Sequence, residues 1–163
     1  MPPTRDEFRR TMGRFATGVT VITTRYGDHL HGMTANAVTS LSLDPMLVLV
    51  CVEKNADTHD ILLKAGFFAV NILARDQEEL ATSLATKKGD AWTHGLDHVE
   101  HRVAQTGAPI IDGSLAYLDC KTLTEHHGGD HTIFIGEVVE AKELSEAEPL
   151  LFYTGKFGNF TAD

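Results

Sequence analysis

Hydroxyl and amide side chains are concentrated in one short stretch of this sequence, residues 32–43, which reads GMTANAVTSLSL. Such groups, together with free backbone amides, can bind the phosphate of a flat polar ligand without a cluster of lysines. After Asp44-Pro45, which predicts a turn, the apolar β-branched run MLVLVCV predicts a buried strand. We therefore expect a polar β-ribbon that is backed by a buried strand and could hold a ligand. A threonine- and serine-rich edge hairpin without a ligand is the alternative.

Several familiar catalytic and nucleotide-binding motifs are absent from the sequence. No G-x-G-x-x-G follows a predicted strand, and Gly155-Lys156 precedes Phe157 rather than the Ser or Thr of a P-loop. No G-x-S-x-G elbow occurs, and neither Cys51 nor Cys120 has a convincing catalytic neighbour in sequence. These absences argue against a Rossmann domain, a P-loop enzyme and an α/β-hydrolase.

The sequence contains nine histidines, which raises the question of a metal site. His94, His98 and His101 would share a helix face, but glycine and loop residues interrupt them. His127 and His131 are four residues apart, with two glycines between them that favour a turn. No cysteine or carboxylate set completes a four-ligand site. We expect solvated loop histidines and no metal.

Composition indicates one domain over residues 1–163, with 42% hydrophobic and 23% charged residues. The formal net charge of −9 argues against binding to nucleic acid or to an anionic membrane surface. No apolar run approaches the roughly 20 residues that cross a bilayer, and the first ten residues lack the apolar segment of a secretory signal. We expect a cytoplasmic protein.

Three helices are predicted from capping residues and apolar spacing. Residues 4–7 form a capping box, and the apolar residues that follow extend this first helix toward Gly18. Asp57 could cap a second helix that Gly66 ends, and Asp76 a third with Leu80 and Leu84 on its inner face.

Strands are predicted between and after these helices, and they do not alternate strictly with them. Residues 86–113 are irregular, which is typical of a functional loop or of a segment structured by a partner. Six or seven short strands with peripheral helices favour a small antiparallel barrel. Besides the ribbon and its buried strand, the expected strands are residues 19–24, 67–73, 114–124, 132–144 and 149–154.

Four segments occur in the order that is typical of one protein family. They are GMTANAVTSLSLDPMLVLVCV, FFAVNIL with the helix after it, GDHTIFIGEVVEA and PLLFYTGKFG. Over residues 8–160 the chain resembles the flavin reductase-like family, the short NAD(P)H:flavin oxidoreductases that supply two-component monooxygenases. The resemblance implies a mainly β split barrel of the FMN-binding type that works as a homodimer and binds FMN or FAD at the dimer interface. It also implies NADH or NADPH as hydride donor and a monooxygenase as the partner that receives reduced flavin.

The resemblance also implies which residues bind the flavin. One group would line the isoalloxazine ring and the ribityl chain, and a second would meet the phosphate at a strand-to-helix connection, where a helix N-terminus favours an anion. A lysine pair would lie near the flavin tail, although a solvated helix end explains that pair equally well. The three groups are Met33, Thr34, Ala35, Asn36, Thr39 and Ser40; Lys54, Asn55, Thr58 and His59; and Lys87 and Lys88.

For the nicotinamide nucleotide, Gly129-Asp130-His131 resembles the family's GDH turn, whose histidine is associated with nicotinamide binding. By the same resemblance, Tyr153, Gly155 and Phe157 would lie beside the nicotinamide and the flavin ring. Phe157 could stack on a planar ring or pack in the core.

The expected reaction is hydride transfer from nicotinamide C4 to flavin N5, which the two nucleotides themselves supply. The protein would hold the rings within about 3–3.5 Å and stabilise charge at the flavin N1–C2=O end through backbone amides. No obligatory proton-transfer residue is expected, and His131 would position the nicotinamide. The alternatives are a flavin carrier or sensor without turnover, a split-barrel flavin oxidase with its own substrate, and a metal-dependent module.

Overall fold

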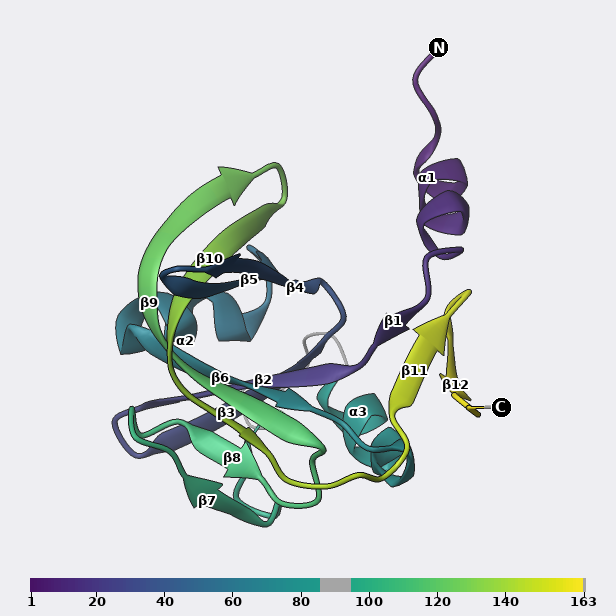
Figure 1. The fold of residues 1–163 in the computed structure, drawn as a ribbon. Coiled ribbons are helices and arrows are strands. Elements are labelled where there is room, and N and C mark those ends of the chain that lie inside the picture. Colours follow the sequence, from purple (N-terminus) through teal and green to yellow (C-terminus); the bar gives the residue numbers. More distant parts are fainter. Residues whose placement is uncertain (86–94, 163) are drawn as a thin grey trace.

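The computed structural model describes residues 1–85 and 95–162, which form three helices, one 3₁₀ turn and twelve strands (Figure 1). No helix among these residues is long and apolar enough to cross a membrane. The helical elements are α1 (Arg5–Met12), α2 (Asp57–Ala65), η1 (Arg75–Gln77) and α3 (Glu78–Leu84). The strands are β1 (Thr17–Gly18), β2 (Thr20–Tyr26), β3 (His29–Ala35), β4 (Val38–Leu43), β5 (Met46–Glu53), β6 (Phe67–Ile72), β7 (His101–Val103), β8 (Pro109–Ile111), β9 (Ala116–Gly128), β10 (His131–Glu143), β11 (Leu150–Tyr153) and β12 (Lys156–Asn159).

Seven of the strands form one antiparallel sheet in the order β3-β2-β6-β9-β10-β5-β4. The sheet coils around its own interior, as the curved β9 and β10 in Figure 1 show. Its edge strands β3 and β4 follow each other in the chain, yet no pairing joins them in the described structure. The sheet therefore curls toward closure and stays open between its edges. This arrangement confirms the predicted mainly β, split-barrel fold with peripheral helices.

The hydroxyl-rich stretch is divided between the two edges of this sheet. Residues 33–35 belong to β3 and pair with β2, whereas residues 38–43 belong to β4 and pair with β5. Asn36 and Ala37 carry the chain across the opening. The predicted pairing of the polar ribbon with the buried strand therefore holds for its second half only, because the first half pairs with β2 instead.

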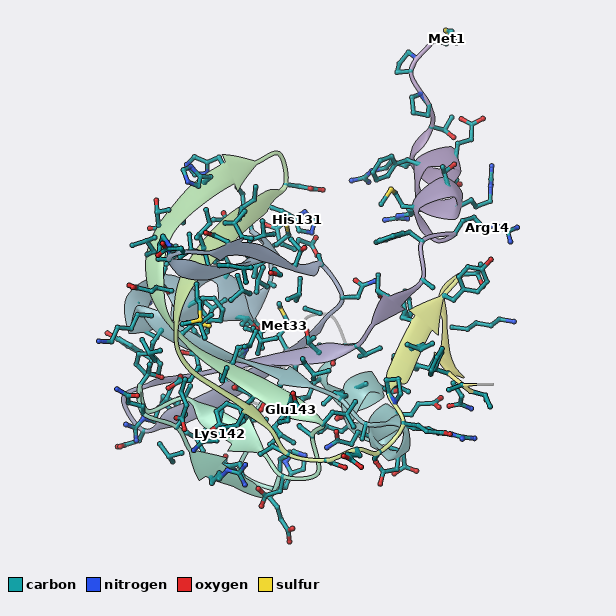
Figure 2. The ribbon with its side chains drawn as sticks, viewed as in Figure 1. Met1, Arg14, Met33, His131, Lys142 and Glu143 are labelled. Atoms are coloured by element: carbon teal, nitrogen blue, oxygen red, sulfur yellow. The ribbon has the colours of Figure 1, made fainter. Side chains whose placement is uncertain are left out.

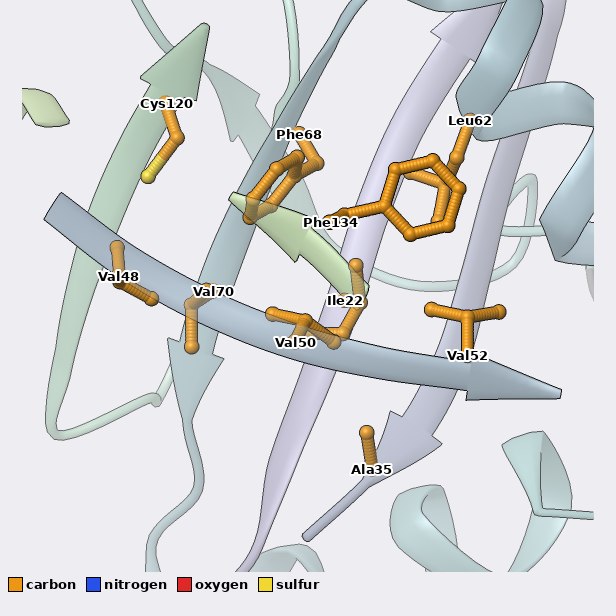
Figure 3. Packing of buried hydrophobic residues seen from close by; sticks show 10 residues of the cluster. All are labelled: Ile22, Ala35, Val48, Val50, Val52, Leu62, Phe68, Val70, Cys120 and Phe134. Atoms are coloured by element: carbon orange, nitrogen blue, oxygen red, sulfur yellow. The ribbon is translucent and has the colours of Figure 1, made fainter. Parts of the chain in front are cut away.

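Side chains from six strands and one helix fill the interior of the split barrel (Figure 3). In β5, Val48, Val50 and Val52 are buried in this core, while the residues that alternate with them are half-buried. A strand presents successive side chains to opposite faces, so β5 has one core face and one apolar face that is partly open. The remaining members of the core cluster are Ile22, Ala35, Leu62, Phe68, Val70, Cys120 and Phe134.

The long hairpin of β9 and β10 crosses this core at a point where only a glycine fits. A Cβ atom on Gly136 would lie 2.6 Å from Phe68 Cζ and 2.8 Å from Cys120 Cβ. The ladder between the two strands shifts register beside this residue. The close contact lets the hairpin bend over the barrel, and its tip at Gly129 and Asp130 extends beyond the sheet.

Helix α1 starts as predicted, with Thr4 and Glu7 in a reciprocal capping box. It ends at Gly13 rather than Gly18, because residues 17–18 are taken up by β1, which pairs with β11. Helix α2 ends at Gly66, which has φ 73°, as predicted. Its N-cap, however, is Ala56, so Asp57 lies in the first turn and is not the cap. Helix α3 begins after Gln77, and Asp76 does not cap it.

Two small sheets complete the fold. Strands β7 and β8 pair within the stretch that the sequence analysis treated as irregular, and β12 was not predicted. The hairpin β11–β12 lies beside the C-terminal end of α1, where the Thr154 N–H donates to the Gly13 carbonyl at 2.9 Å. Helix α1 and this hairpin extend from one side of the barrel (Figure 1).

Candidate functional site

A pocket of about 370 Å³ lies where β3, the connection from β5 to α2, the start of β10 and the end of α3 come together. In Figure 2, His131 lies near the tip of the long hairpin and Met33 lies below it, on β3. The pocket is lined by Met33, Thr34, Ala35, Asn36, Ala37, Cys51, Glu53, Asn55, Ala56, Asp57, Thr58, Leu84, Ala85 and His131.

Strand β3 forms one wall of the pocket and is an edge of the sheet. An edge strand pairs on one side only, so alternate backbone amides and carbonyls of β3 point away from β2. The Thr34 hydroxyl donates to the Ala81 carbonyl of α3 at 2.7 Å, and the Thr20 hydroxyl donates to the Ala35 carbonyl at 2.6 Å. These bonds fix β3 against α3 and β2, so its backbone offers a rigid polar edge to a flat ring.

The N-terminal end of α2 forms the opposite wall. Its N-cap, Ala56, provides no side-chain hydrogen bond to the first turn, and the helix dipole favours an anion there. Thr58 is buried, and its hydroxyl is 2.7 Å from His31 Nε2. Asp57 also lines the pocket, and the negative charge of its carboxylate weakens the binding of an anion at this end of the helix.

His131 enters the pocket from the first position of β10 and remains partly exposed. Its Nδ1 is 2.7 Å from Asp130 Oδ1. This hydrogen bond, the charge of the ring and the nearby Arg5 guanidinium lower the pKa of the Asp130 carboxyl below its ordinary value. Arg5 of α1 lies 4.0 Å from Asp130 Oδ2. The carboxylate therefore orients the imidazole and leaves Nε2 available to a ligand.

Lys54, in the connection from β5 to α2, and His59, in the first turn of α2, make their contacts away from the pocket. The Lys54 ammonium donates to the Gly129 carbonyl at 2.7 Å. His59 is buried, with Nδ1 3.1 Å from Asp60 Oδ1 and Nε2 2.9 Å from Thr132 Oγ1. Neither residue is among those that line the pocket, and their predicted contact with flavin stays a prediction.

Thr39 and Ser40, on β4, line a second pocket of about 460 Å³. Its lining is mainly apolar and comes chiefly from β4, β5, β6, β9 and β10, so it lies at the β4 edge of the split barrel. Asn36 lines both pockets, so the two cavities adjoin at the crossing of the chain. The structure therefore separates these two hydroxyls from the other residues predicted to bind flavin.

The residues predicted to lie beside the nicotinamide ring are on the C-terminal hairpin. Arg14 Nη1 donates to the Tyr153 hydroxyl at 3.3 Å, and Gly155 has φ 78° in the tight turn. The Phe157 ring packs edge-on against Phe152, with 5.7 Å between the ring centroids. None of these three residues lines the pocket that contains His131 in the described chain. Lys87 and Lys88 lie outside the described residues.

Comparison with known proteins identifies the family. The family model described as "Flavin reductase like domain" matches residues 12–161. The chain therefore belongs to the flavin reductase-like family. It is 42% identical over 163 residues to the NADH-dependent FAD reductase of Streptomyces globisporus, covering 99% of this chain and 89% of that protein.

Two further relatives of this flavin reductase-like chain are similar over nearly the whole domain. One is the reductase component of 4-nitrophenol 4-monooxygenase/4-nitrocatechol 2-monooxygenase from Rhodococcus opacus, 39% identical, covering 98% of this chain and 83% of that protein. The other is a solved structure of the Streptomyces globisporus C-1027 NADH:FAD oxidoreductase SgcE6 with NAD and FAD fragments. It superposes with a TM-score of 0.89 at 42% identity and covers 100% of this chain and 96% of that one.

These similarities confirm several of the expectations drawn from the sequence. The family and the split-barrel fold are confirmed, as are the activity of an NAD(P)H:flavin oxidoreductase and the pairing of a flavin with a nicotinamide nucleotide. A role as the reductase component of a two-component monooxygenase is also supported by the names of the relatives.

Seven of the residues that line the pocket of this flavin reductase-like chain were not predicted as site residues, and two of them, Cys51 and Glu53, lie on β5. Cys51 and Glu53 alternate along β5 with buried valines, and so face the pocket rather than the core. The strand's period of two could have revealed them, but the unbroken apolar run suggested burial on both faces. Burial raises the pKa of the Cys51 thiol, which keeps it protonated. Among the described residues, no three His, Cys, Asp or Glu side chains gather as a metal site.

Proposed function

We propose that the 370 Å³ pocket binds the isoalloxazine ring of FAD and that NADH reduces the flavin there. One observation carries this assignment: a single pocket collects seven of the residues that the sequence predicted for the two nucleotides. The named relatives that pair NADH with FAD support the choice of both nucleotides. The seven residues are Met33, Thr34, Ala35, Asn36, Asn55, Thr58 and His131.

The walls of the pocket suit the parts of a flavin nucleotide. The backbone of residues 33–36 would hydrogen-bond the polar edge of the ring and stabilise the charge that develops on it. The N-terminal end of α2, with Asn55 and Thr58, would receive the phosphate side. Nε2 of His131 would hydrogen-bond the carboxamide or the pyrophosphate of NADH.

When bound, NADH supplies the hydride and the flavin accepts it. The protein's part is to bring the two rings into contact and exclude water between them. The thiol of Cys51, protonated because burial raises its pKa, and the amide of Asn36 add neutral polar groups beside the ring. None of these roles requires an obligatory proton donor or acceptor.

We also propose that the chain works as a homodimer in which α1 packs against a second copy. None of the eight residues of α1 is buried against the described part of its own chain, although Phe8 and Met12 share one face of the helix. Phe15, just beyond the helix, is 71% exposed. The mouth of the second pocket presents Leu43, 87% exposed, and Met46. Two unpartnered apolar surfaces on one chain are suited to reciprocal burial across a twofold axis.

The reduced flavin would pass to a monooxygenase. The names of relatives that are reductase components of such systems support this step. The 370 Å³ pocket is partly open to solvent and is smaller than FAD and NADH together would need, so part of the nucleotides would lie outside it. A flavin held in this way can dissociate after reduction, as a transferred product must.

The test is steady-state oxidation of NADH by the purified protein with FAD, repeated with FMN and with NADPH. We expect turnover with NADH and FAD, and flavin that exchanges freely on a desalting column. Flavin binding without NADH oxidation would instead indicate a carrier or sensor. Flavin that stays tightly bound, with turnover only when an organic substrate is added, would indicate an oxidase.

A further inference from the structure

The connection from β5 to α2 and the first turn of α2 are bonded to the β9–β10 hairpin on the two sides of His131. On one side, the Lys54 backbone N–H donates to the Asp130 carbonyl at 2.9 Å, and the Lys54 ammonium donates to the Gly129 carbonyl at 2.7 Å. On the other side, His59 Nε2 lies 2.9 Å from Thr132 Oγ1. His131 is the single residue between these two attachments.

His59 has the surroundings of a buried structural side chain. It is 9% exposed, and its ring meets the edge of Phe134 with 5.7 Å between centroids at 72°. A ring that donates from Nδ1 to the Asp60 carboxylate leaves Nε2 to accept a hydrogen bond from the Thr132 hydroxyl. Both ring nitrogens are thus engaged within the protein, and neither is directed at the 370 Å³ pocket.

We propose that Lys54 and His59 are positioning residues that fix His131 relative to the flavin pocket, rather than flavin ligands. We call their contacts with Gly129, Asp130 and Thr132 the brace. The brace joins the phosphate-side wall of the pocket to the residue that handles nicotinamide. This inference rests on the proposed function and adds to it a structural link between the two nucleotide sites.

Loss of the brace should affect the nicotinamide side more than the flavin side. Helix α2 keeps two other anchors, the hydrogen bond between Thr58 and His31 and the fully buried Leu62. The tip of the hairpin is exposed, and Gly129 has φ 68° in a tight turn. The backbone of His131 stays paired with Glu53 of β5 and Gly128 of β9, so loss of the brace should free the hairpin tip and the orientation of the His131 side chain rather than the strand itself.

The experiment compares His59→Phe, which keeps an aromatic ring but loses Nε2, with His59→Gln, which keeps a hydrogen-bonding group there. Flavin affinity is measured by quenching of flavin fluorescence, and NAD⁺ affinity for the flavin-loaded protein by calorimetry. For His59→Phe we expect an increase of about 3- to 10-fold in the Kd for NAD⁺ and in the KM for NADH. We expect the Kd for flavin to change less than about twofold, and His59→Gln to restore most of the loss.

Thr132→Val removes the other partner of the same hydrogen bond and should reproduce His59→Phe. The matched control is Thr24→Val, because Thr24 is also buried, its hydroxyl donates to the Phe67 carbonyl at 2.7 Å, and neither residue lines the pocket. This control should lower the melting temperature and leave both affinities unchanged. If His59 only stabilises the fold, His59→Phe should behave like Thr24→Val and lower the melting temperature without changing either affinity.

A double variant separates positioning from direct contact. If His59 acts through His131, then His59→Phe should add nothing to the loss of NAD⁺ affinity in His131→Ala. Additive losses, or a loss of flavin affinity that exceeds the loss for NAD⁺, would overturn the brace. Failure of the wild-type protein to oxidise NADH with any flavin would instead overturn the proposed function, so the two failures are distinguishable.

Discussion

The two sides of the molecule hold their predicted nicotinamide residues in different ways. On one side, the neighbours of His131 are attached to Lys54, just after β5, and to His59 of α2 by hydrogen bonds of 2.7–2.9 Å. On the other side, Tyr153, Gly155 and Phe157 lie on the hairpin β11–β12, which shares a projecting arm with α1 (Figure 1). His131 is therefore held by contacts within its own chain, whereas the β11–β12 hairpin extends from the barrel.

Under the proposed function, this difference means that one chain builds the flavin pocket but does not complete the nicotinamide site. No residue of β11 or β12 is among the described residues that line the pocket with His131. The apolar side chains of the projecting arm are exposed, as is typical of a surface that packs against a partner. In the proposed homodimer, a second copy would bury the arm and could bring its hairpin beside the first copy's His131.

The largest effect should come from removing the apolar face of the arm. The double variant Phe8→Ser/Phe15→Ser deletes two aromatic side chains that are 59% and 71% exposed in the single chain. Since buried aromatic residues dominate interface energies, we expect the dimer to dissociate and NADH oxidation to fall about tenfold or more. Light scattering after size-exclusion chromatography reports the mass, and steady-state kinetics report the activity.

The control is Asp6→Ser/Arg10→Ser, which changes two exposed side chains on the opposite face of α1 without changing the net charge. It should remain dimeric and active. A Phe8→Ser/Phe15→Ser protein that is monomeric yet fully active would show that each chain completes its own site, and the contrast between the two sides would disappear.

The next effect concerns the braced side. His131→Ala should raise the KM for NADH about tenfold, because it removes a hydrogen bond to the nucleotide from a pre-oriented ring, and should leave flavin affinity near normal. Steady-state kinetics and flavin titration measure the two separately. His127→Ala changes an exposed histidine on β9, opposite Thr132 on the same hairpin, and should behave as wild type. Equal loss of NADH and flavin binding in His131→Ala would contradict the assignment.

Much of the fold could be predicted because local patterns and tertiary structure agree. The capping box of α1, the glycine that ends α2 and the apolar strand at residues 67–73 each depend on near neighbours in sequence. The site was predictable where it follows such elements, as with residues 33–36 on β3 and His131 at the start of β10. The resemblance to the family supplied the roles of these residues.

The rest could not be predicted because it depends on which strands pair. The hydroxyl-rich stretch gives no indication that β3 pairs with β2 and β4 with β5, so Thr39 and Ser40 were grouped with Thr34 although they line another pocket. Likewise, the sequence placed Lys54 and His59 beside Thr58, but only the tertiary structure shows that they bond to the β9–β10 hairpin.

A smaller effect should separate the brace from direct flavin binding. Lys54→Met removes the bond from the ammonium to the Gly129 carbonyl but keeps the backbone bond to Asp130. Because Lys54 is exposed, we expect an increase of about two- to threefold in the Kd for NAD⁺ and a smaller change for flavin. Calorimetry and fluorescence titration provide both values. A larger change for flavin would show that Lys54 contacts the flavin itself, as the resemblance to the family implies.

The smallest effect should come from a charge rather than a contact. Asp57 lines the phosphate-side wall, so its carboxylate repels a bound phosphate, and Asp57→Asn should tighten FAD binding about twofold at low ionic strength. The gain should vanish as added salt screens the charge. The variant should also melt slightly lower, because Asp57 complements the dipole of α2 in the ligand-free protein. Glu143→Gln removes the same charge from an exposed site at the far end of β10 and should leave flavin affinity unchanged, so an equal gain in both variants would indicate net charge rather than the pocket (Figure 2).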